Sequence, residues 1–187
     1  MKPIGHPSAA GRPRHRLACR HYLLALVLGC ALACVQAQVP PPERAALLDL
    51  YAASNGSAWF QDSGWTGPAG TECSWFGVTC IGGRVVDLRL PGNNLVGSLP
   101  SSLADLDQLS FLWLSSNQLG GFLQPWLGEL SALTFLYLDN NQFSGPIPSG
   151  LSNLDQLQWL LLQDNALTGT LPDALGQMSS LRVLRLS

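Results

Sequence analysis

The sequence predicts an α/β solenoid in which 24-residue coils stack on a parallel β-sheet behind a helical N-terminal cap. Three sets of residues support this prediction, because leucines, asparagines and glycines each recur at intervals of 24 residues. The three columns are Leu109, Leu133, Leu157 and Leu181; Asn93, Asn117, Asn141 and Asn165; and Gly97, Gly121, Gly145 and Gly169. A fixed period of this length is typical of repeat architectures, in which each unit buries its apolar side chains against its neighbours.

Each coil is predicted to open with a short strand. Leu112 and Leu114 alternate with Phe111 and Trp113. A period of two places the leucines on the buried face of a strand and the aromatic residues on the opposite face. Stacked coils then pair their strands at about 4.8 Å per coil. We expect the asparagine after the strand to be buried and to bond the backbone of its own coil and of the next coil, because inward-turning backbone groups need partners.

The second half of each coil predicts a bend, an extended segment and a short helical turn. The glycine column suits a positive-φ bend, and a residue before proline avoids the helical region. Apolar residues three apart fit a helical or 3₁₀ turn on the convex side. These pairs are Leu103/Leu106, Leu127/Leu130, Leu151/Leu154 and Leu175/Met178. One coil places Gln124 in the proline position with Pro125 after it, and we expect a local shift there without loss of the fold.

The repeat resembles a known family. L-x-G-x-I/L-P-x-x-L within a 24-residue unit, with Leu99-Pro100, Ile147-Pro148 and Leu171-Pro172 in the proline position, resembles the plant-specific class of leucine-rich repeats. That class occurs in receptor-like kinase ectodomains, receptor-like proteins and polygalacturonase-inhibiting proteins. The resemblance implies a leucine-rich-repeat solenoid with a concave parallel sheet, and a receptor ectodomain or an inhibitor of a cell-wall enzyme. Similar units occur in algae, oomycetes and bacteria, so the pattern does not fix the organism.

Residues 1–37 predict a secretory signal peptide. A basic head precedes Tyr22–Val35, an apolar run of 14 residues that is shorter than the roughly 20 residues of a membrane span. Small residues before Gln38 offer a cleavage site. The basic head is long for a signal peptide, so a retained membrane anchor is an alternative. Cys30 and Cys34 lie in segments that loosely resemble bacterial lipoprotein cleavage boxes, and lipidation is a further alternative for a bacterial source.

Removal of this segment leaves a chain without histidine or lysine. Five arginines face 12 acidic residues, which gives a net charge of −7 and argues against binding to nucleic acids or anionic membranes. The usual catalytic bases and nucleophiles are missing, and we expect no enzyme activity, no cofactor and no metal site. A carboxylate pair drawn from Asp87, Asp139 and Asp164 is the weaker alternative, because two acids can hydrolyse glycosides.

The N-terminal cap is expected over residues 38–83. Val39–Pro42 predicts a stiff leader and Glu43–Ser54 a helix, which Asn55-Gly56 ends. Asn55-Gly56-Ser57 is a glycosylation sequon in an exposed turn. The aromatic-rich segment Trp59–Cys80 is expected to cover the first core layer of the solenoid, which would otherwise be open to water.

Cys73 and Cys80 are the two cysteines that remain after residue 37. In an oxidising compartment they predict a disulfide, since a metal site would need further ligands. The surrounding C-S-W-F-G-V-T-C closely resembles the C-x-W-x-G-V-x-C core of the plant-type N-terminal cap.

Residues 84–187 are expected to form four full coils and one truncated coil. The fifth copy stops at Ser187 in mid-coil, whereas terminal repeats normally carry a polar outer face. We therefore expect a fragment of a longer chain. The alternative is a short natural protein with a frayed or self-associating end.

The outward strand positions define what we call the concave face. Its two central rows are Asp87, Phe111, Phe135, Trp159 and Val183, and Arg89, Trp113, Tyr137, Leu161 and Arg185. Solvent-facing strand positions are normally polar, and an exposed aromatic patch marks an interaction surface. The alternative is that the rings pack on one another across the strands. The expected ligand-binding residues are Phe111, Trp113, Phe135, Tyr137, Asp139 and Trp159.

The sequence thus predicts a secreted or cell-surface recognition module that binds a protein, peptide or glycan. The polar rows beside the rings, Ser115, Asp139 and Gln163, and Ser116, Asn140 and Asp164, suit each of these ligands. The alternative is a structural protein of the cell wall or matrix without a specific ligand. Attachment to a membrane is expected only through residues 1–37 or through sequence after Ser187.

Overall fold

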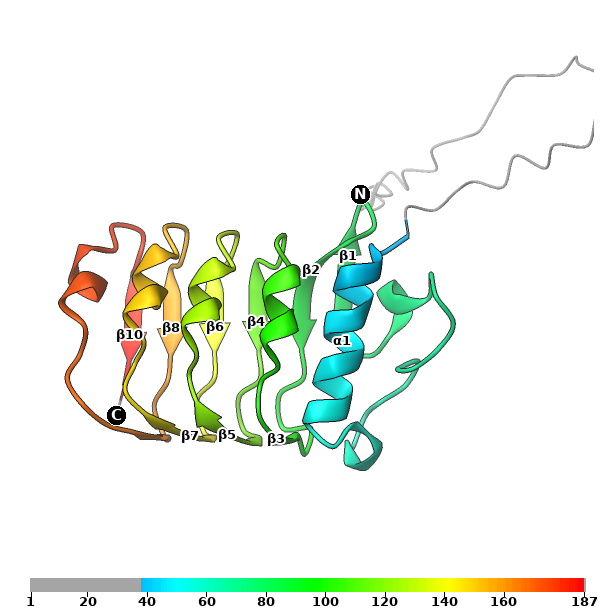
Figure 1. Cartoon of the computed structure of the whole chain (residues 1–187), viewed down its shortest axis with the longest axis horizontal. Coiled ribbons are helices and arrows are strands. Elements are labelled where there is room, and N and C mark those ends of the chain that lie inside the picture. The colour runs from blue at the N-terminus through cyan, green and yellow to red at the C-terminus, as the bar shows by residue number, and fades with distance from the viewer. Residues whose placement is uncertain (1–37, 187) are drawn as a thin grey trace, which may run out of the picture. The chain divides into compact units, whose positions relative to one another are not determined.

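The computed structural model describes residues 38–186. The predicted signal peptide, with its anchor and lipidation alternatives, lies outside the described residues, as does Ser187. Within the described range, helix α1 (Pro41–Ala53) and two short 3₁₀ helices, η1 (Gly56–Ala58) and η2 (Glu72–Ser74), precede the coils. The predicted solenoid with its helical cap is confirmed (Figure 1).

Helix α1 begins two residues earlier than the sequence analysis predicts. Pro41 and Pro42 form its first turn, where proline is tolerated because the first backbone N–H groups of a helix have no intrahelical partner. The interpretation of Val39–Pro42 as a leader is therefore wrong for its last two residues. The helix packs one apolar face on the core, with Ala46, Leu47 and Leu50 fully buried.

The main sheet has six strands in the order β1-β2-β4-β6-β8-β10, and they lie side by side in Figure 1. The strands are β1 (Val78–Ile81), β2 (Arg84–Arg89), β4 (Phe111–Trp113), β6 (Phe135–Tyr137), β8 (Trp159–Leu161) and β10 (Val183–Arg185). Strand β1 runs antiparallel to β2, and the other neighbours are parallel. Leu88, Leu112, Leu136 and Leu160 pair across the sheet and point into the core, where none is accessible.

The segments that come after the asparagines in the chain form a second parallel sheet, which was not predicted from the sequence. Its strands are β3 (Val96–Gly97), β5 (Gln118–Phe122), β7 (Gln142–Gly145) and β9 (Ala166–Leu167), in that order. These segments are short and rich in glycine, so they carry no apolar–polar alternation that would indicate a strand. Their pairing arises because the coils stack in register.

Short 3₁₀ helices close each coil on the side opposite the concave face, as predicted. They are η3 (Ser101–Asp105), η4 (Pro125–Glu129), η5 (Ser149–Asn153) and η6 (Asp173–Gln177). The expected shift at Gln124 is wrong, because η4 begins in register with the other three. Gln124 adopts φ −91° and ψ 150°, close to Pro148 at φ −69° and ψ 135°. Pro125 occupies the first helical position, where its missing N–H costs nothing.

The predicted burial holds for Asn93 but is wrong for Asn117, Asn141 and Asn165, which are half-buried. Each of these three bonds its own coil and the preceding one. The Asn141 amide oxygen accepts the N–H of Leu119 at 3.0 Å, and its nitrogen donates to the carbonyls of Leu114 at 2.9 Å and Leu138 at 3.1 Å. Asn117 and Asn165 repeat this pattern. The prediction of a bond to the next coil is therefore wrong in direction, because the unpaired backbone groups that face each side chain belong to the coil before it.

The cap takes the place of a preceding coil for the first asparagine. Asn93 accepts the N–H of Gln61 at 2.7 Å and donates to the Gln61 carbonyl at 2.9 Å. The fully buried Glu43 on α1 accepts the N–H of Val85 at 2.8 Å and pairs with Arg84. These contacts tie the cap to the first strand of the repeats.

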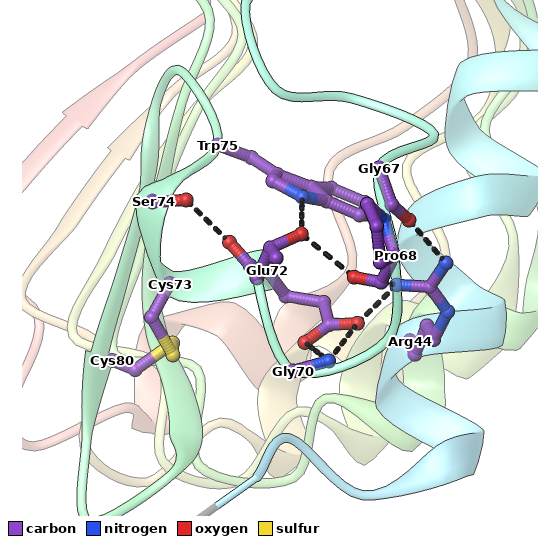
Figure 2. A network of polar contacts seen from close by, with 10 residues as sticks. Arg44, Gly67, Pro68, Gly70, Glu72, Cys73, Ser74, Trp75 and Cys80 are labelled. Carbon is purple, nitrogen blue, oxygen red and sulfur yellow. Dashed lines mark hydrogen bonds and ion pairs between the residues drawn. A yellow bond between two sulfur atoms is a disulfide. The ribbon is translucent and has the colours of Figure 1, made fainter. Parts of the chain in front are cut away.

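A network of polar contacts fixes the cap loop that contains Gly70 and Glu72 (Figure 2). Arg44 on α1 pairs with the buried Glu72, which also accepts the N–H of Gly70 at 2.9 Å. The Arg44 guanidinium lies 5.2 Å from the centre of the Trp75 ring. Cys73 and Cys80 form the predicted disulfide next to this network, with their Cα atoms 5.4 Å apart.

Three tryptophans of the cap cover the first core layer, as predicted. Trp59, Trp65 and Trp75 are buried, and the centre of the Trp65 ring lies 4.9 Å from that of Trp59 and 5.2 Å from that of Trp75.

Within residues 38–186, no helix combines the length and the apolar character that crossing a membrane requires.

The asparagine ladder generates a stability prediction. Asn141→Ala should lower the free energy of unfolding by roughly 2–4 kcal/mol, because buried backbone groups of two coils lose their partners. Urea unfolding followed by circular dichroism measures the change. Asn153→Ala is the matched control, because Asn153 is exposed at the end of η5 and should change stability by less than about 0.5 kcal/mol. Equal effects of the two substitutions would contradict the role of the ladder.

Candidate functional site

The strand register places the predicted aromatic residues together on the concave face. Phe111, Phe135 and Trp159 pair across β4, β6 and β8 in one row. Trp113 and Tyr137 pair in the adjacent row, which Leu161 continues. The coils thus bring together side chains that are up to 48 residues apart in the sequence.

The five rings form a continuous surface, which we call the aromatic cluster. The ring centres lie 5.1 Å apart for Phe111 and Phe135, 6.2 Å for Trp113 and Tyr137, and 6.4 Å for Phe135 and Trp159. Their planes are inclined to one another by 41° to 80°, a packing that favours contacts between ring edges and ring faces. Trp159 is 37% exposed, and the other four rings are half-buried.

An ion pair borders the cluster on β2, and the sequence analysis did not include it among the site residues. Arg89 lies over the Phe111 ring at 4.3 Å from its centre and donates to the Asp87 carboxylate at 2.7 Å. A guanidinium over an aromatic face is attracted by the electron density of the ring. The sequence did contain a signal for this ion pair, because Asp87 and Arg89 occupy the first positions of the two rows that contain the aromatic residues.

Polar residues form the neighbouring row. The Asp139 carboxylate accepts a hydrogen bond from the Ser115 hydroxyl, and the Asn140 amide donates to the Ser116 hydroxyl at 3.1 Å. Burial, and then the negative charge of Asp139, raise the pKa of the Tyr137 hydroxyl above its ordinary value. Tyr137 therefore presents a neutral hydroxyl beside a carboxylate at physiological pH.

The remaining predicted positions lie outside the cluster. Asn55 is exposed, with φ 57°, between α1 and η1. A further tryptophan outside the cluster, Trp126, is half-buried on η4 and packs against the core. Asp164, one of the acids considered for glycoside hydrolysis, is exposed. Among residues 38–186, no three His, Cys, Asp or Glu side chains lie close enough together to hold a metal ion.

Comparison with known families matches both parts of this architecture. Residues 40–81 match the family described as "Leucine rich repeat N-terminal domain". Residues 108–130, 132–154 and 156–178 match the family "Leucine Rich Repeat". This chain is a plant-type leucine-rich-repeat protein.

Relatives of this leucine-rich-repeat protein include plant receptor kinases. It is 41% identical over 73 residues to "Probable inactive receptor kinase RLK902" of Arabidopsis thaliana, a match that covers 38% of the chain and 11% of the relative. It therefore spans about a tenth of the length of that relative.

Two solved structures are also similar. A chain of the BIR3–SERK2 complex from Arabidopsis thaliana is 30% identical, with a TM-score of 0.65 over 74% of this chain and 79% of that one. The plant peptide hormone receptor RGFR1 in complex with RGF2 is 38% identical, with a TM-score of 0.53 over 54% of this chain and 16% of that one.

The raised pKa values of the tyrosines in this leucine-rich-repeat protein lead to a prediction about their titration. After residue 37 the chain contains two tyrosines, Tyr51 and Tyr137, and both have a raised pKa. A raised folded-state pKa stabilises the fold at pH values below the unfolded pKa, about 10, and that contribution is lost as the pH rises through the folded pKa. We expect tyrosinate absorbance of the folded chain to appear only above about pH 10.

Asp139→Asn should move the Tyr137 transition to lower pH, because it removes the neighbouring negative charge. Tyr137→Phe identifies which of the two transitions moves. Asp62→Asn is the matched control, because Asp62 faces Tyr51 and raises its pKa. This substitution should move the Tyr51 transition and leave the Tyr137 transition in place. A Tyr137 transition that stays in place in Asp139→Asn would show that the charge of Asp139 does not reach the ring.

Proposed function

We propose that this protein is an extracellular recognition module that captures a peptide segment on its concave face. The observation that carries the proposal is the aromatic cluster, which occupies outward strand positions where polar residues are the norm. Aromatic side chains supply rigid contact area with little conformational freedom to lose, and they dominate many binding interfaces. The neutral Tyr137 hydroxyl and the Asp139 carboxylate add polar groups that fix the orientation of a ligand.

The geometry of the rings favours a peptide over a glycan. A sugar stacks its apolar face on a flat, accessible ring, whereas these rings meet at inclined angles and four of the five are half-buried. Rings packed edge to face present apolar surface that apolar side chains of a peptide can contact. The description of RGFR1 as a peptide hormone receptor supports the same ligand class.

The proposal predicts a loss of binding without a loss of fold. Trp113→Ala combined with Trp159→Ala should weaken peptide binding at least about tenfold, because each ring offers contact energy of at least 1 kcal/mol. Peptides are first selected from a displayed random library by binding to the immobilised chain that begins at Gln38. Their affinities for the parent and the variant are then measured by fluorescence polarisation, and thermal melting reports the fold.

Phe60→Ala combined with Phe122→Ala is the matched control, because these rings are 70% and 63% exposed and lie outside the aromatic cluster. The control should bind the selected peptides as the parent does. A tryptophan variant that melts many degrees lower, with no peptide selected on the parent, would instead show that the rings serve packing. That result would support the alternative that this is a structural protein of the cell wall or matrix without a specific ligand.

The proposed extracellular location rests on the receptor-kinase relatives, the disulfide and the predicted signal peptide. Expression of residues 1–187 in plant cells should release into the medium a chain that begins at Gln38. Intact mass should show an oxidised Cys73–Cys80 pair and a glycan at Asn55 that Ser57→Ala removes. A cell-bound product that keeps residues 1–37 would support the retained anchor and contradict secretion.

A further inference from the structure

Two arginines lie on either side of the apolar residues in the row that contains Trp113 and Tyr137. The register of the main sheet runs from Arg89 through Trp113, Tyr137 and Leu161 to Arg185. Neighbouring strands are about 4.8 Å apart, so four steps separate the two arginines by about 19 Å. Between the two arginines the row is therefore apolar.

Both arginine side chains are accessible to a ligand. Arg89 is 48% exposed, and its guanidinium is held between the Phe111 ring and the less accessible Asp87 carboxylate. Arg185 is exposed and forms no ion pair with another residue of the described range 38–186. The carboxylate of Asp139 belongs to the adjacent row and accepts a hydrogen bond from Ser115.

The Asp87 partner leaves Arg89 with hydrogen-bonding capacity. A guanidinium carries five N–H donors, and in this pair one terminal nitrogen contacts one oxygen of Asp87. An exposed ion pair is worth at most about 1 kcal/mol, so the contact is weak enough to be shared with an incoming carboxylate. The Phe111 ring orients the guanidinium before the ligand arrives, which lowers the entropy cost of binding.

We propose that the captured peptide crosses the strands in an extended conformation and carries two acidic residues six positions apart, one at Arg89 and one at Arg185. This inference rests on the proposed function. An extended chain rises about 3.3 Å per residue, so six residues span about 20 Å. Its side chains alternate, so an even separation places both acids on the face that meets the sheet. The frame is acid-x-Φ-x-Φ-x-acid, where Φ is an apolar residue that contacts the rings.

The test compares two displayed heptapeptide libraries on the immobilised chain from Gln38. One library has Asp or Glu at positions 1 and 7 and the other has Asn or Gln there, with apolar residues at positions 3 and 5 of both. We expect the acidic library to be enriched at least about tenfold over the neutral one. Binding of the acidic peptides should weaken as sodium chloride is raised, because salt screens exposed charges.

Loss of an arginine and loss of the competing carboxylate should change the affinity for acidic peptides in opposite directions. Arg89→Gln and Arg185→Gln should each weaken acidic peptides roughly threefold to tenfold. Asp87→Asn should strengthen them, because it removes the carboxylate that competes for Arg89. Arg182→Gln is the matched control, because this exposed arginine precedes β10 and lies outside the row, so its effect should be smaller.

The outcomes separate this inference from the proposed function. Equal enrichment of both libraries, with binding that still depends on Trp113 and Trp159, would overturn the acidic frame and leave peptide capture standing. A stronger response to the neutral library, or weaker binding in Asp87→Asn, would overturn the frame as well. Binding of neither library, while peptides selected from the random library still bind, would likewise overturn the frame. Failure of the random library as well, or binding that is indifferent to the two tryptophans, would overturn peptide capture itself.

Discussion

The structure depends on how each coil satisfies the backbone where the chain leaves the strand. That turn brings N–H and carbonyl groups into an apolar interior, where an unpaired group is costly. Each asparagine of the ladder pairs with such groups in two coils at once, as Asn141 does with Leu138 of its own coil and Leu119 of the preceding one. A slip between the strand segments of neighbouring coils would separate the amide from its partners. The ladder therefore stabilises the register of the sheet.

The cap must meet the same requirement without being a repeat. Gln61 presents its N–H and carbonyl to Asn93 as the backbone of an earlier coil would. Glu43 accepts the N–H of Val85, at the edge where strand β2 begins. A buried carboxylate is costly unless charges and donors surround it, and Arg84 provides that compensation. Glu72 is compensated in the same way by Arg44 and the N–H of Gly70.

Periodicity made much of the fold predictable, because one column observed several times identifies a structural role. The strands, the 3₁₀ turns and the positive-φ glycines follow from such columns. Several features that occur once were not predicted, including the buried acids Glu43 and Glu72 and the start of α1 at Pro41. The second sheet was missed for another reason, since its strands lack alternation and form only because stacked coils share a register.

The candidate site shows the same division between repeated and single features. The aromatic rows were predictable because the outward positions of a strand follow from its inward leucines. The angles between the rings depend on side-chain packing, which no sequence pattern encodes. The contact of Arg89 with both Phe111 and Asp87 also required coordinates, because it joins two strands and two rows.

Strict register has a consequence for recognition as well as for stability. A row of side chains across stacked coils has a fixed spacing of about 4.8 Å, whereas an extended peptide has its own spacing of about 3.3 Å per residue. The two spacings coincide only at certain intervals, close to four coils for six peptide residues. A solenoid can thus select a ligand by the distance between two anchor groups, with the rings between them providing contact area. Because strand pairing sets the coil spacing, the same register that stabilises the fold also determines which anchors a ligand must carry.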